Sequence, residues 1–405
     1  MKHASLAGLL AGFAVCAALP CAARQDSAPS KGAVPGDTGE KPAEKVVAVK
    51  PSREAAVSAA ARAILAREEK DAPGEWPYEG VYRVEGKIPI GYRVGGSAIC
   101  AMAMMETPEF AESKEMHEAV QRAMGVVIKG AGHPLMSVEE YNAGYDVRGW
   151  GYTYGLMFLL EMKGRGLIGE AEKDAAEKTI LHYIEAIEKT EIPQVGGWNY
   201  ARPPGKDKVA PPSPFMTAPT LQALFEAKKQ GYMVDGTVVG RALAYLESSR
   251  AGSGAVAYSG GAKTGPKDAV PGAVGRMLAT ETTLFLAGRG SQERLRGAVD
   301  AFIVHWEWLN QRRAKPGTHM GPYNIAPYYF YYAHYYAARA VEMLPENERA
   351  EYRRRVNDLL FATRNDEDGS WNDRVFDRSA SYGSSMAVMV MMMPDAPKPA
   401  GWTKP

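Results

Sequence analysis

The stretch YTYGLMFLLEMK at residues 152–163, followed by IGEAEKDAAEKTILHYIEAIEKT at 168–190, shows the pattern that decides the fold. The first segment is apolar on nearly all sides, which is typical of a helix buried all round. The second has apolar residues at three- and four-residue spacing with charged residues between them, which predicts a helix exposed on one side. Gly164 and Gly166 between them predict a short turn. The pair is therefore interpreted as an inner helix and an outer helix.

The same alternation extends along the chain from Arg53. The other charged segments are 53–69, 113–129, 235–250, 292–313 and 346–363, and the other nearly uncharged ones are 96–106, 217–228, 276–287, 325–342 and 379–393. Six half-exposed helices alternating with six buried ones require two concentric rings. An open solenoid would make the same hairpins but would not need every second helix to be so apolar. The sequence therefore predicts an all-α fold, an α/α toroid of about six helical hairpins.

The connections that lead from a charged segment to an uncharged one are long and rich in Gly and Pro. All six should meet at one end of the ring, at the N-terminal ends of the buried helices; we call this end the long-loop rim. Loops on a rigid frame usually carry function, and converging helix N-termini favour negative charge. We therefore expect any functional site on the long-loop rim.

Four of the long connections contain a glycine followed by a tryptophan. The copies are Gly74-Glu75-Trp76, Gly149-Trp150-Gly151-Tyr152, Gly196-Gly197-Trp198 and Asp368-Gly369-Ser370-Trp371. We expect the glycine to make a tight turn and the tryptophan to cover the joint between neighbouring hairpins. The last copy, in LLFATRNDEDGSW at 359–371, resembles the Gln-Trp repeat of the squalene cyclase and protein prenyltransferase superfamily. The resemblance extends over 53–393 as a repeat pattern, and it implies the α/α toroid already predicted.

The residues that carry the chemistry of that superfamily are absent from the sequence. There is no Asp-x-Asp-Asp-type acid motif, and the acidic run 366–368 belongs to a structural turn. Cys100 lies in an apolar stretch without Asp or His at the spacing of zinc ligands, so we interpret it as a core residue. No metal ion and no other cofactor is expected.

Tyrosine is concentrated in the segment PYNIAPYYFYYAHYYAAR at 322–339, and the chain has 21 Tyr against 10 Phe. Most of these rings should pack in the core. Their hydroxyl groups suit a polar or glycan-like ligand better than a carbocation. We therefore expect Tyr328 and Tyr332, which share one helix face, to line a ligand pocket.

Ionisable side chains on or beside the buried helices are the other candidates, because an unpaired charge there would be costly. Asp146 and Asp373 each stand close to an arginine in the sequence, and the competing interpretation of these pairs is a salt bridge on the rim. The competing interpretation of His334 is a buried core residue. Glu281 is hardest to dismiss, since its segment is otherwise uncharged. The candidate catalytic residues are Glu281, Asp146, Asp373 and His334. The candidate ligand-binding residues are Arg93, Arg148, Trp150, Tyr152, His319, Asn324, Tyr328 and Tyr332.

The N-terminal residues predict export. Lys2, an apolar run over 4–19 and small residues at 21–23 are typical of a signal peptide, which we assign to 1–23. The expected location is periplasmic or extracellular. A lipoprotein anchor at Cys21 is disfavoured because Pro20 precedes it.

The remaining organisation follows from composition. Residues 24–52 are rich in Pro, Gly and Lys and predict a disordered linker, ahead of the toroid domain at 53–393 and a C-terminal tail at 394–405. The charge is balanced, with 48 basic and 47 acidic residues, so nucleic acid is not an expected partner. No mature segment is apolar over the length of a transmembrane helix.

Three functions remain open. The first is binding of a small molecule, a glycan or a protein at the cavity rim, without cyclase or zinc chemistry. The second is a carbohydrate-active enzyme of the glycosidase or polysaccharide lyase type, since α/α toroids also host these. Such a hydrolase needs two of Asp146, Glu281 and Asp373 within about 5 to 10 Å of each other. The third is a terpenoid cyclase, which the missing acid motif opposes.

Overall fold

The computed structural model describes residues 50–402, except 140–144 and 200–210. The predicted signal peptide and nearly all of the predicted linker lie outside these residues and stay predictions. Over the described part the chain is helical, and its only β-type pairings are three isolated bridges in the connections.

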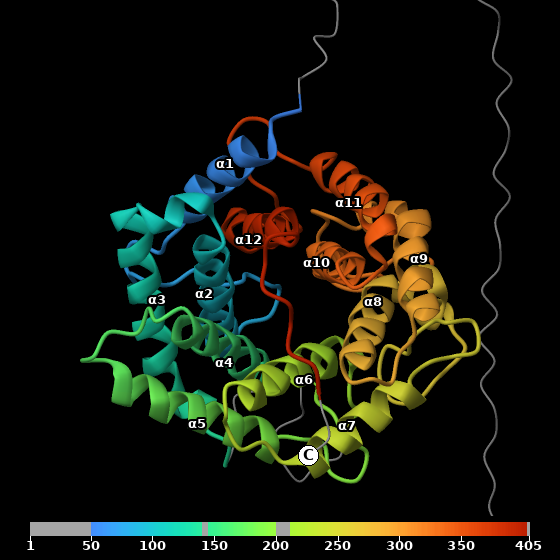
Figure 1. Cartoon of the computed structure of the whole chain (residues 1–405), viewed down its shortest axis with the longest axis horizontal. Helices are drawn as coiled ribbons and strands as arrows, with labels where there is room; N and C mark the ends of the chain where they lie inside the picture. The colour runs from blue at the N-terminus through green and yellow to red at the C-terminus, as the bar shows by residue number, and fades with distance from the viewer. Residues whose placement is uncertain (1–49, 140–144, 200–210, 403–405) are drawn as a thin grey trace, which may run out of the picture. The chain divides into compact units, whose positions relative to one another are not determined.

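Twelve helices form two concentric rings in the described part of the chain (Figure 1). The inner helices are α2 (Ile90–Met105), α4 (Arg148–Gly164), α6 (Pro214–Lys229), α8 (Val270–Leu286), α10 (Tyr329–Val341) and α12 (Ala380–Met392). The outer helices are α1 (Arg53–Leu65), α3 (Lys114–Ala131), α5 (Lys173–Lys189), α7 (Gly236–Ser248), α9 (Gln292–Asn310) and α11 (Glu346–Phe361). Short 3₁₀ turns lie in the connections at Pro108–Ala111, Pro134–Met136, Pro266–Asp268 and Asp377–Ser379. Each inner helix packs against the next, and α12 packs against α2, which confirms the predicted α/α toroid.

The ring is closed by helices that are far apart in the sequence. α1 packs mainly against α12, with only minor contact to α2. The chain thus forms five hairpins in which an inner helix is followed by its outer partner. α1 and α12 together make the sixth (Figure 1).

Three of the four Gly–Trp loops share one geometry, which explains the repeat. Each indole Nε1 donates to a carbonyl near the end of the preceding outer helix: Trp76 to Ile64 at 2.7 Å, Trp198 to Ile187 at 2.8 Å, and Trp371 to Leu360 at 3.0 Å. Each tryptophan backbone N–H donates to a hydroxyl on the next inner helix: Ser97 at 2.9 Å, Thr217 at 3.0 Å, and Ser384 at 3.1 Å. The tryptophan therefore joins two consecutive helices at the rim, as the sequence predicts.

Steric crowding explains why the Gly–Trp loop requires glycine. Gly74 has φ 90°, and a Cβ at this position would lie 2.6 Å from the backbone of Arg122. Gly196 repeats the arrangement, with φ 85° and the backbone of Arg241 at 2.6 Å. A side chain at either position would clash with the neighbouring outer helix.

The fourth copy is different, and the expectation for Trp150 is wrong. Trp150 lies in the first turn of α4, and its ring packs 5.7 Å from that of Tyr78, 5.3 Å from Tyr92 and 5.0 Å from Tyr154. It therefore faces the axis of the ring and covers no joint. A glycine–tryptophan pair inside a helix cannot make the turn that the other copies make.

The C-terminal segment 394–402 crosses the opposite face of the ring, where the inner helices end (Figure 1). The backbone N–H of Trp402 donates to the carbonyl of Leu286 at 3.0 Å, and its ring packs 5.5 Å from that of Phe225. The segment thereby joins α12 to the ends of α6 and α8.

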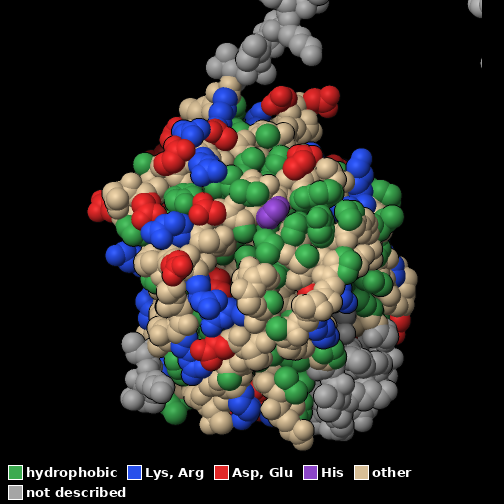
Figure 2. All heavy atoms as spheres, turned by 90° about the vertical axis from the view of Figure 1, so that its right-hand side faces the viewer, with side chains coloured by type: hydrophobic (Ala, Val, Ile, Leu, Met, Phe, Trp, Pro, Cys, Tyr) green, Lys and Arg blue, Asp and Glu red, His purple; other side chains and the backbone are tan. Residues whose placement is uncertain are grey.

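The outside of the ring has the mixed surface expected of half-exposed helices. On the side that carries α9, charged and apolar side chains are interspersed (Figure 2). Within residues 50–402, apart from the two gaps, no helix is long and apolar enough to cross a membrane.

Candidate functional site

Aromatic side chains close the axis of the ring at the long-loop rim. They surround a space of only about 20 Å³ and come from the first turns of the inner helices or the loops before them: Tyr78, Tyr92, Trp150, Phe215, Tyr328 and Tyr382. We call these six residues the aromatic cluster. A space of this size holds a water molecule at most. Within the aromatic cluster the described side chains therefore fill the axis and leave no room for a small-molecule ligand.

A buried carboxyl and a buried guanidinium meet at one tyrosine of this cluster. The Tyr78 hydroxyl donates to Oδ2 of Asp373 at 3.2 Å and accepts from Nε of Arg374 at 3.0 Å. Asp373 is 0% exposed, and its Oδ1 has no hydrogen-bond partner among the described residues. Burial raises the pKa of the Asp373 carboxyl to about 7, although Arg374 acts in the opposite direction. Asp373 can therefore hold or release a proton near neutral pH.

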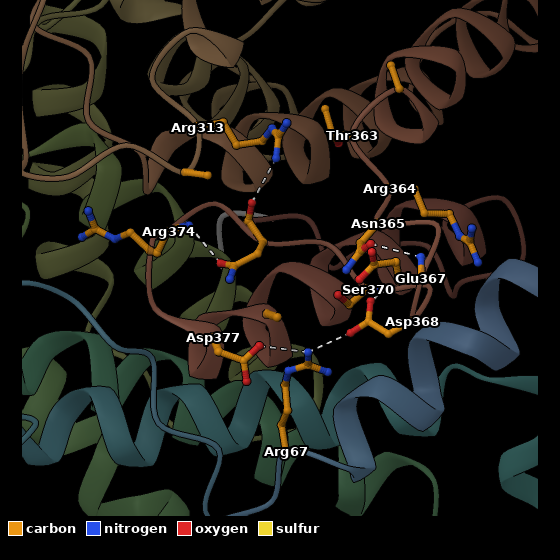
Figure 3. A pocket seen from close by; sticks show the side chains of 14 residues that line it. Arg67, Arg313, Thr363, Arg364, Asn365, Glu367, Asp368, Ser370, Arg374 and Asp377 are labelled. Carbon is orange, nitrogen blue, oxygen red and sulfur yellow. Dashed lines mark hydrogen bonds and ion pairs between the residues drawn. The ribbon is translucent and has the colours of Figure 1, made fainter. Parts of the chain in front are cut away.

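A polar cavity of about 570 Å³ lies beside this carboxyl (Figure 3). We call it the rim cavity. Arg67 contributes from just after α1, Arg313 and Ala314 contribute from just after α9, and the remainder of the wall belongs to 362–380, which includes both sequence neighbours of Asp373. Its polar lining consists of Arg67, Arg313, Thr363, Arg364, Asn365, Glu367, Asp368, Ser370, Asn372, Arg374 and Asp377.

Ion pairs fix one wall of the rim cavity. Arg67 bonds to Asp368 at 2.8 Å and to Asp377 at 3.1 Å (Figure 3). On another wall, Arg313 donates from Nη1 to the backbone carbonyl of Asn372 at 3.4 Å and from Nε to Asn310 at 3.3 Å, and its Nη2 has no hydrogen-bond partner among the described residues. Arg67 is thus engaged by two carboxylates, while Nη2 of Arg313 can bind a ligand.

Three of the four candidate catalytic residues have structural partners elsewhere. Glu281 faces the outer ring, 3.2 Å from Arg250 and 4.0 Å from Arg294. Inner helix α8 accommodates this carboxylate because the two arginines from the outer ring neutralise it. Asp146 forms a 2.9 Å ion pair with Arg148 in the connection before α4.

His334 is held between α9 and its own helix. Its Nε2 accepts from the indole of Trp306 at 3.0 Å, and its Nδ1 lies 2.9 Å from the carbonyl of Phe330. Burial lowers the pKa of His334 to about 4, so the ring is neutral at physiological pH. Glu281, Asp146 and His334 therefore contact different parts of the fold, and Asp373 alone among the four lies beside the rim cavity.

The candidate ligand-binding residues divide in the same way. Trp150 and Tyr328 belong to the aromatic cluster, and His319 lies 3.0 Å from the Tyr328 hydroxyl. The other five candidates have structural roles. Arg93 donates to Glu75 at 2.7 Å, and Arg148 donates to Asp146. Tyr152 donates to the Met136 carbonyl, and Tyr332 donates to the Phe215 carbonyl at 3.1 Å. Asn324 occupies a turn with φ 47°.

Sequence reasoning missed Tyr78 and Arg313, and it considered Arg374 only as a member of an Asp/Arg pair on the rim. A signal for Tyr78 was present, because it stands two positions after Trp76, as Asp373 stands two positions after Trp371. Since the tryptophan geometry repeats, the residue two positions later is aimed at the axis in both loops. In the described ranges, no group of three or more His, Cys, Asp or Glu is placed to hold a metal ion.

Comparison with known proteins supports the fold. No protein-family model matches the sequence, and no curated protein sequence does. The structure is similar to the alpha-1,6-mannanase from Salegentibacter sp. HEL1_6, with 11% identity, 85% of this chain and 99% of that chain covered, and a TM-score of 0.51. It is also similar to the unsaturated glucuronyl hydrolase from Bacillus sp. GL1, with 14% identity, 84% and 96% covered, and a TM-score of 0.55.

A weaker likeness joins the chain to the type II terpene cyclase MstE from Scytonema. The identity is 13%, 85% of this chain and 99% of that chain are covered, and the TM-score is 0.44. At this score the likeness carries no argument about function. The two stronger matches place the chain among α/α toroids, and at these identities they show the fold alone.

Proposed function

We propose that the protein binds a carbohydrate on its long-loop rim, in the rim cavity beside Asp373. The observation that carries the proposal is the lining of this cavity. Guanidinium, carboxylate, amide and hydroxyl groups surround about 570 Å³ at the end of the ring where the long connections meet. Such groups match a ligand rich in hydroxyls, which both donates and accepts hydrogen bonds.

The packed axis argues against an isoprenoid ligand. A pocket for a small molecule usually has about 300 Å³ or more, mostly apolar. The aromatic cluster leaves only about 20 Å³. The two stronger structural matches are named for action on carbohydrates, a mannanase and a glucuronyl hydrolase linked to glycosaminoglycan degradation, and this supports the proposal by analogy of fold.

Binding can be tested with a variant that fills the cavity. Ala362 is exposed, has ordinary helical backbone angles and lines the rim cavity, so Ala362→Trp should fold normally and obstruct the ligand. Ala350→Trp is the matched control, because Ala350 is an exposed residue near the other end of α11. We expect calorimetry with a panel of neutral and acidic oligosaccharides to detect binding that Ala362→Trp weakens about tenfold or more. A folded protein that binds no member of the panel contradicts the proposal, and so does binding that Ala362→Trp leaves unchanged.

Cleavage of a glycosidic bond is the second candidate, favoured by the place of Asp373 between two residues that line the rim cavity and by its raised pKa. Because Asp146 and Glu281 lie elsewhere, the second carboxylate would have to come from the cavity wall. A general acid must be protonated near the working pH, and burial gives Asp373 a pKa of about 7. The test is product release from any oligosaccharide that binds. If Asp373 donates the proton, Asp373→Asn should retain binding and lose turnover. Turnover that survives in Asp373→Asn would exclude this role.

A further inference from the structure

Two buried arginines beside the site are held by uncharged groups. Among the described residues, the buried arginines are Arg148, Arg276 and Arg374. Arg148 has Asp146 as its carboxylate partner. Arg276, 1% exposed, donates only to backbone carbonyls, and Arg374 donates to the Tyr78 hydroxyl and to the carbonyl of Gly317. Hydrogen bonds to neutral groups offset part of the desolvation cost of these two charges, and a counter-charge would offset more of it.

Two half-buried arginines at the end of α9 are held in the same way. Arg312 donates to the carbonyls of Ile325, Pro316 and Thr318. Arg313 donates to the side chain of Asn310 and to the carbonyl of Asn372. None of Arg276, Arg312, Arg313 and Arg374 forms an ion pair with a described carboxylate; we call these four residues the arginine group.

The structural arginines of the ring joints show the contrast. Arg93 is paired with Glu75, Arg122 with Glu68 and Arg241 with Glu191. Guanidinium groups that serve only the frame are thus neutralised at several joints of the ring. The arginine group differs from these joint arginines, and two of its members, Arg313 and Arg374, line the rim cavity.

Three members of the arginine group, Arg276, Arg312 and Arg374, form one positive region around His319. Burial, together with neighbouring positive charge, lowers the pKa of His319 to about 4. That charge comes from Arg276, Lys267, Arg374 and Arg312. Burial lowers the pKa of Arg312 as well, and the charge of Arg374 adds to the effect. These residues are therefore close enough to repel one another. The N-termini of the inner helices at the same rim add to the positive potential.

We infer that the rim cavity selects an acidic saccharide, one whose carboxylate groups are bound by Arg313, with Arg374 adding positive charge in the same cavity wall. This inference rests on the proposed function and specifies its ligand. Arg313 and Arg374 both line the rim cavity. Arg313 is half-buried, and Figure 3 shows it on the cavity wall above the α11–α12 connection. A guanidinium binds a carboxylate through two parallel hydrogen bonds, which a neutral hydroxyl cannot replace.

The test uses a ligand pair that differs only in charge. Hexagalacturonate and its fully methyl-esterified form have the same sugar chain, and acetate supplies the carboxylate alone. We expect calorimetry on the full chain to show hexagalacturonate binding at least about tenfold more tightly than the ester, with no measurable binding of acetate at the same concentration.

Variants then connect the difference to Arg313. Arg313→Gln should weaken hexagalacturonate binding about tenfold or more and leave the ester almost unchanged, while Arg313→Lys should fall between them. Arg349→Gln is the matched control. Arg349 is also half-buried with its guanidinium on a backbone carbonyl, that of Leu344, but it lies near the start of α11. Unchanged thermal unfolding of each variant shows that the fold is intact.

The outcomes separate the inference from the function on which it rests. Equal binding of the charged and esterified chains, unaffected by Arg313→Gln, overturns the inference and leaves carbohydrate binding standing. Acetate that binds as tightly as hexagalacturonate supports an anion site and contradicts carbohydrate binding. A folded protein that binds none of the three probes overturns the inference, and failure across the broader neutral panel then overturns the proposed function too.

Discussion

The hydroxyl of Tyr78 donates a hydrogen bond to Asp373 at 3.2 Å although 295 positions separate the two residues in the sequence. The bond lies where the ring closes, between the α1–α2 connection and the α11–α12 connection. Arg378 joins the same connections by bonding to Glu69 and Glu79. The candidate site therefore exists only when the two ends of the ring have met, because each end supplies part of its wall.

Replacing the buried carboxyl should stabilise the protein in a pH-dependent way. The pKa of Asp373 is raised from 3.8 to about 7, so between these pH values the folded state keeps a proton that the unfolded chain has lost. The contribution of Asp373 to stability is therefore greatest below about pH 4, falls as the pH rises towards 7 and then levels off. We expect Asp373→Asn to match the wild type near pH 3.5 and to exceed its free energy of unfolding by about 2 to 4 kcal/mol at pH 8. Urea unfolding at a series of pH values measures this, and a constant difference would show that Asp373 has an ordinary pKa.

The ion pairs at the ring closure should contribute measurably to stability. Arg378 bonds to Glu69 and to the largely buried Glu79, so Arg378→Gln leaves both carboxylates without this partner. We expect a loss of about 1 to 2 kcal/mol in the free energy of unfolding. Arg354→Gln is the control, because Arg354 is exposed and pairs only within α11. Its loss should be below about 0.5 kcal/mol. Equal losses would mean that the closure pairs have no special role.

The indole hydrogen bond of the Gly–Trp loops can be tested at Trp371. Trp371→Phe removes the bond to the Leu360 carbonyl, leaves that buried carbonyl without this partner and creates a small cavity. We expect a loss of about 2 to 4 kcal/mol. Trp150→Phe is the comparison, since Trp150 is also buried but no hydrogen bond joins its indole to another described residue. Its loss should be smaller by about 1 kcal/mol or more in chemical denaturation. A larger loss at Trp150 would contradict the role assigned to the repeat.

The C-terminal segment should stabilise the face opposite the site. Trp402 packs against Phe225 and lies under the ammonium group of Lys228, at 4.0 Å from the ring centroid. Trp402→Ala should lower the free energy of unfolding by about 1 to 3 kcal/mol, and Trp402→Phe should retain most of the packing. Oligosaccharide binding at the long-loop rim should be unchanged in both variants. A binding defect in Trp402→Ala would show that the two faces are coupled.

Periodicity in the sequence predicted the rings well because it depends on local chemistry. An inner helix must be apolar all round and an outer one on a single side, and this difference is visible without any partner. The start of α2 was placed too late, since a charged Arg93 suggested a loop. Its pairing with Glu75 allows the helix to begin at Ile90.

The candidate site was harder to predict, because a charge on a buried helix has several possible meanings. Glu281 has a structural role because Arg250 and Arg294 neutralise it. His334 also has one, because it accepts a hydrogen bond from Trp306. The buried carboxyl of Asp373 is unusual because Tyr78 donates a hydrogen bond to one of its oxygens, while the other oxygen has no partner among the described residues. Such partnerships join distant parts of the chain, so no local pattern indicates them.

Hydrophobic spacing in the sequence indicates that the helices alternate between inner and outer, and turn chemistry indicates that the long connections lie at one rim marked by Gly–Trp loops. Both act over a few residues. The pairing of α1 with α12 and the bond between Tyr78 and Asp373 arise only in the folded chain. The same holds for the four arginines at the rim that form no ion pair with a described carboxylate. The reason is physical: the free energy of a buried charge depends on what lies within a few ångströms in space, which closure of the ring sets.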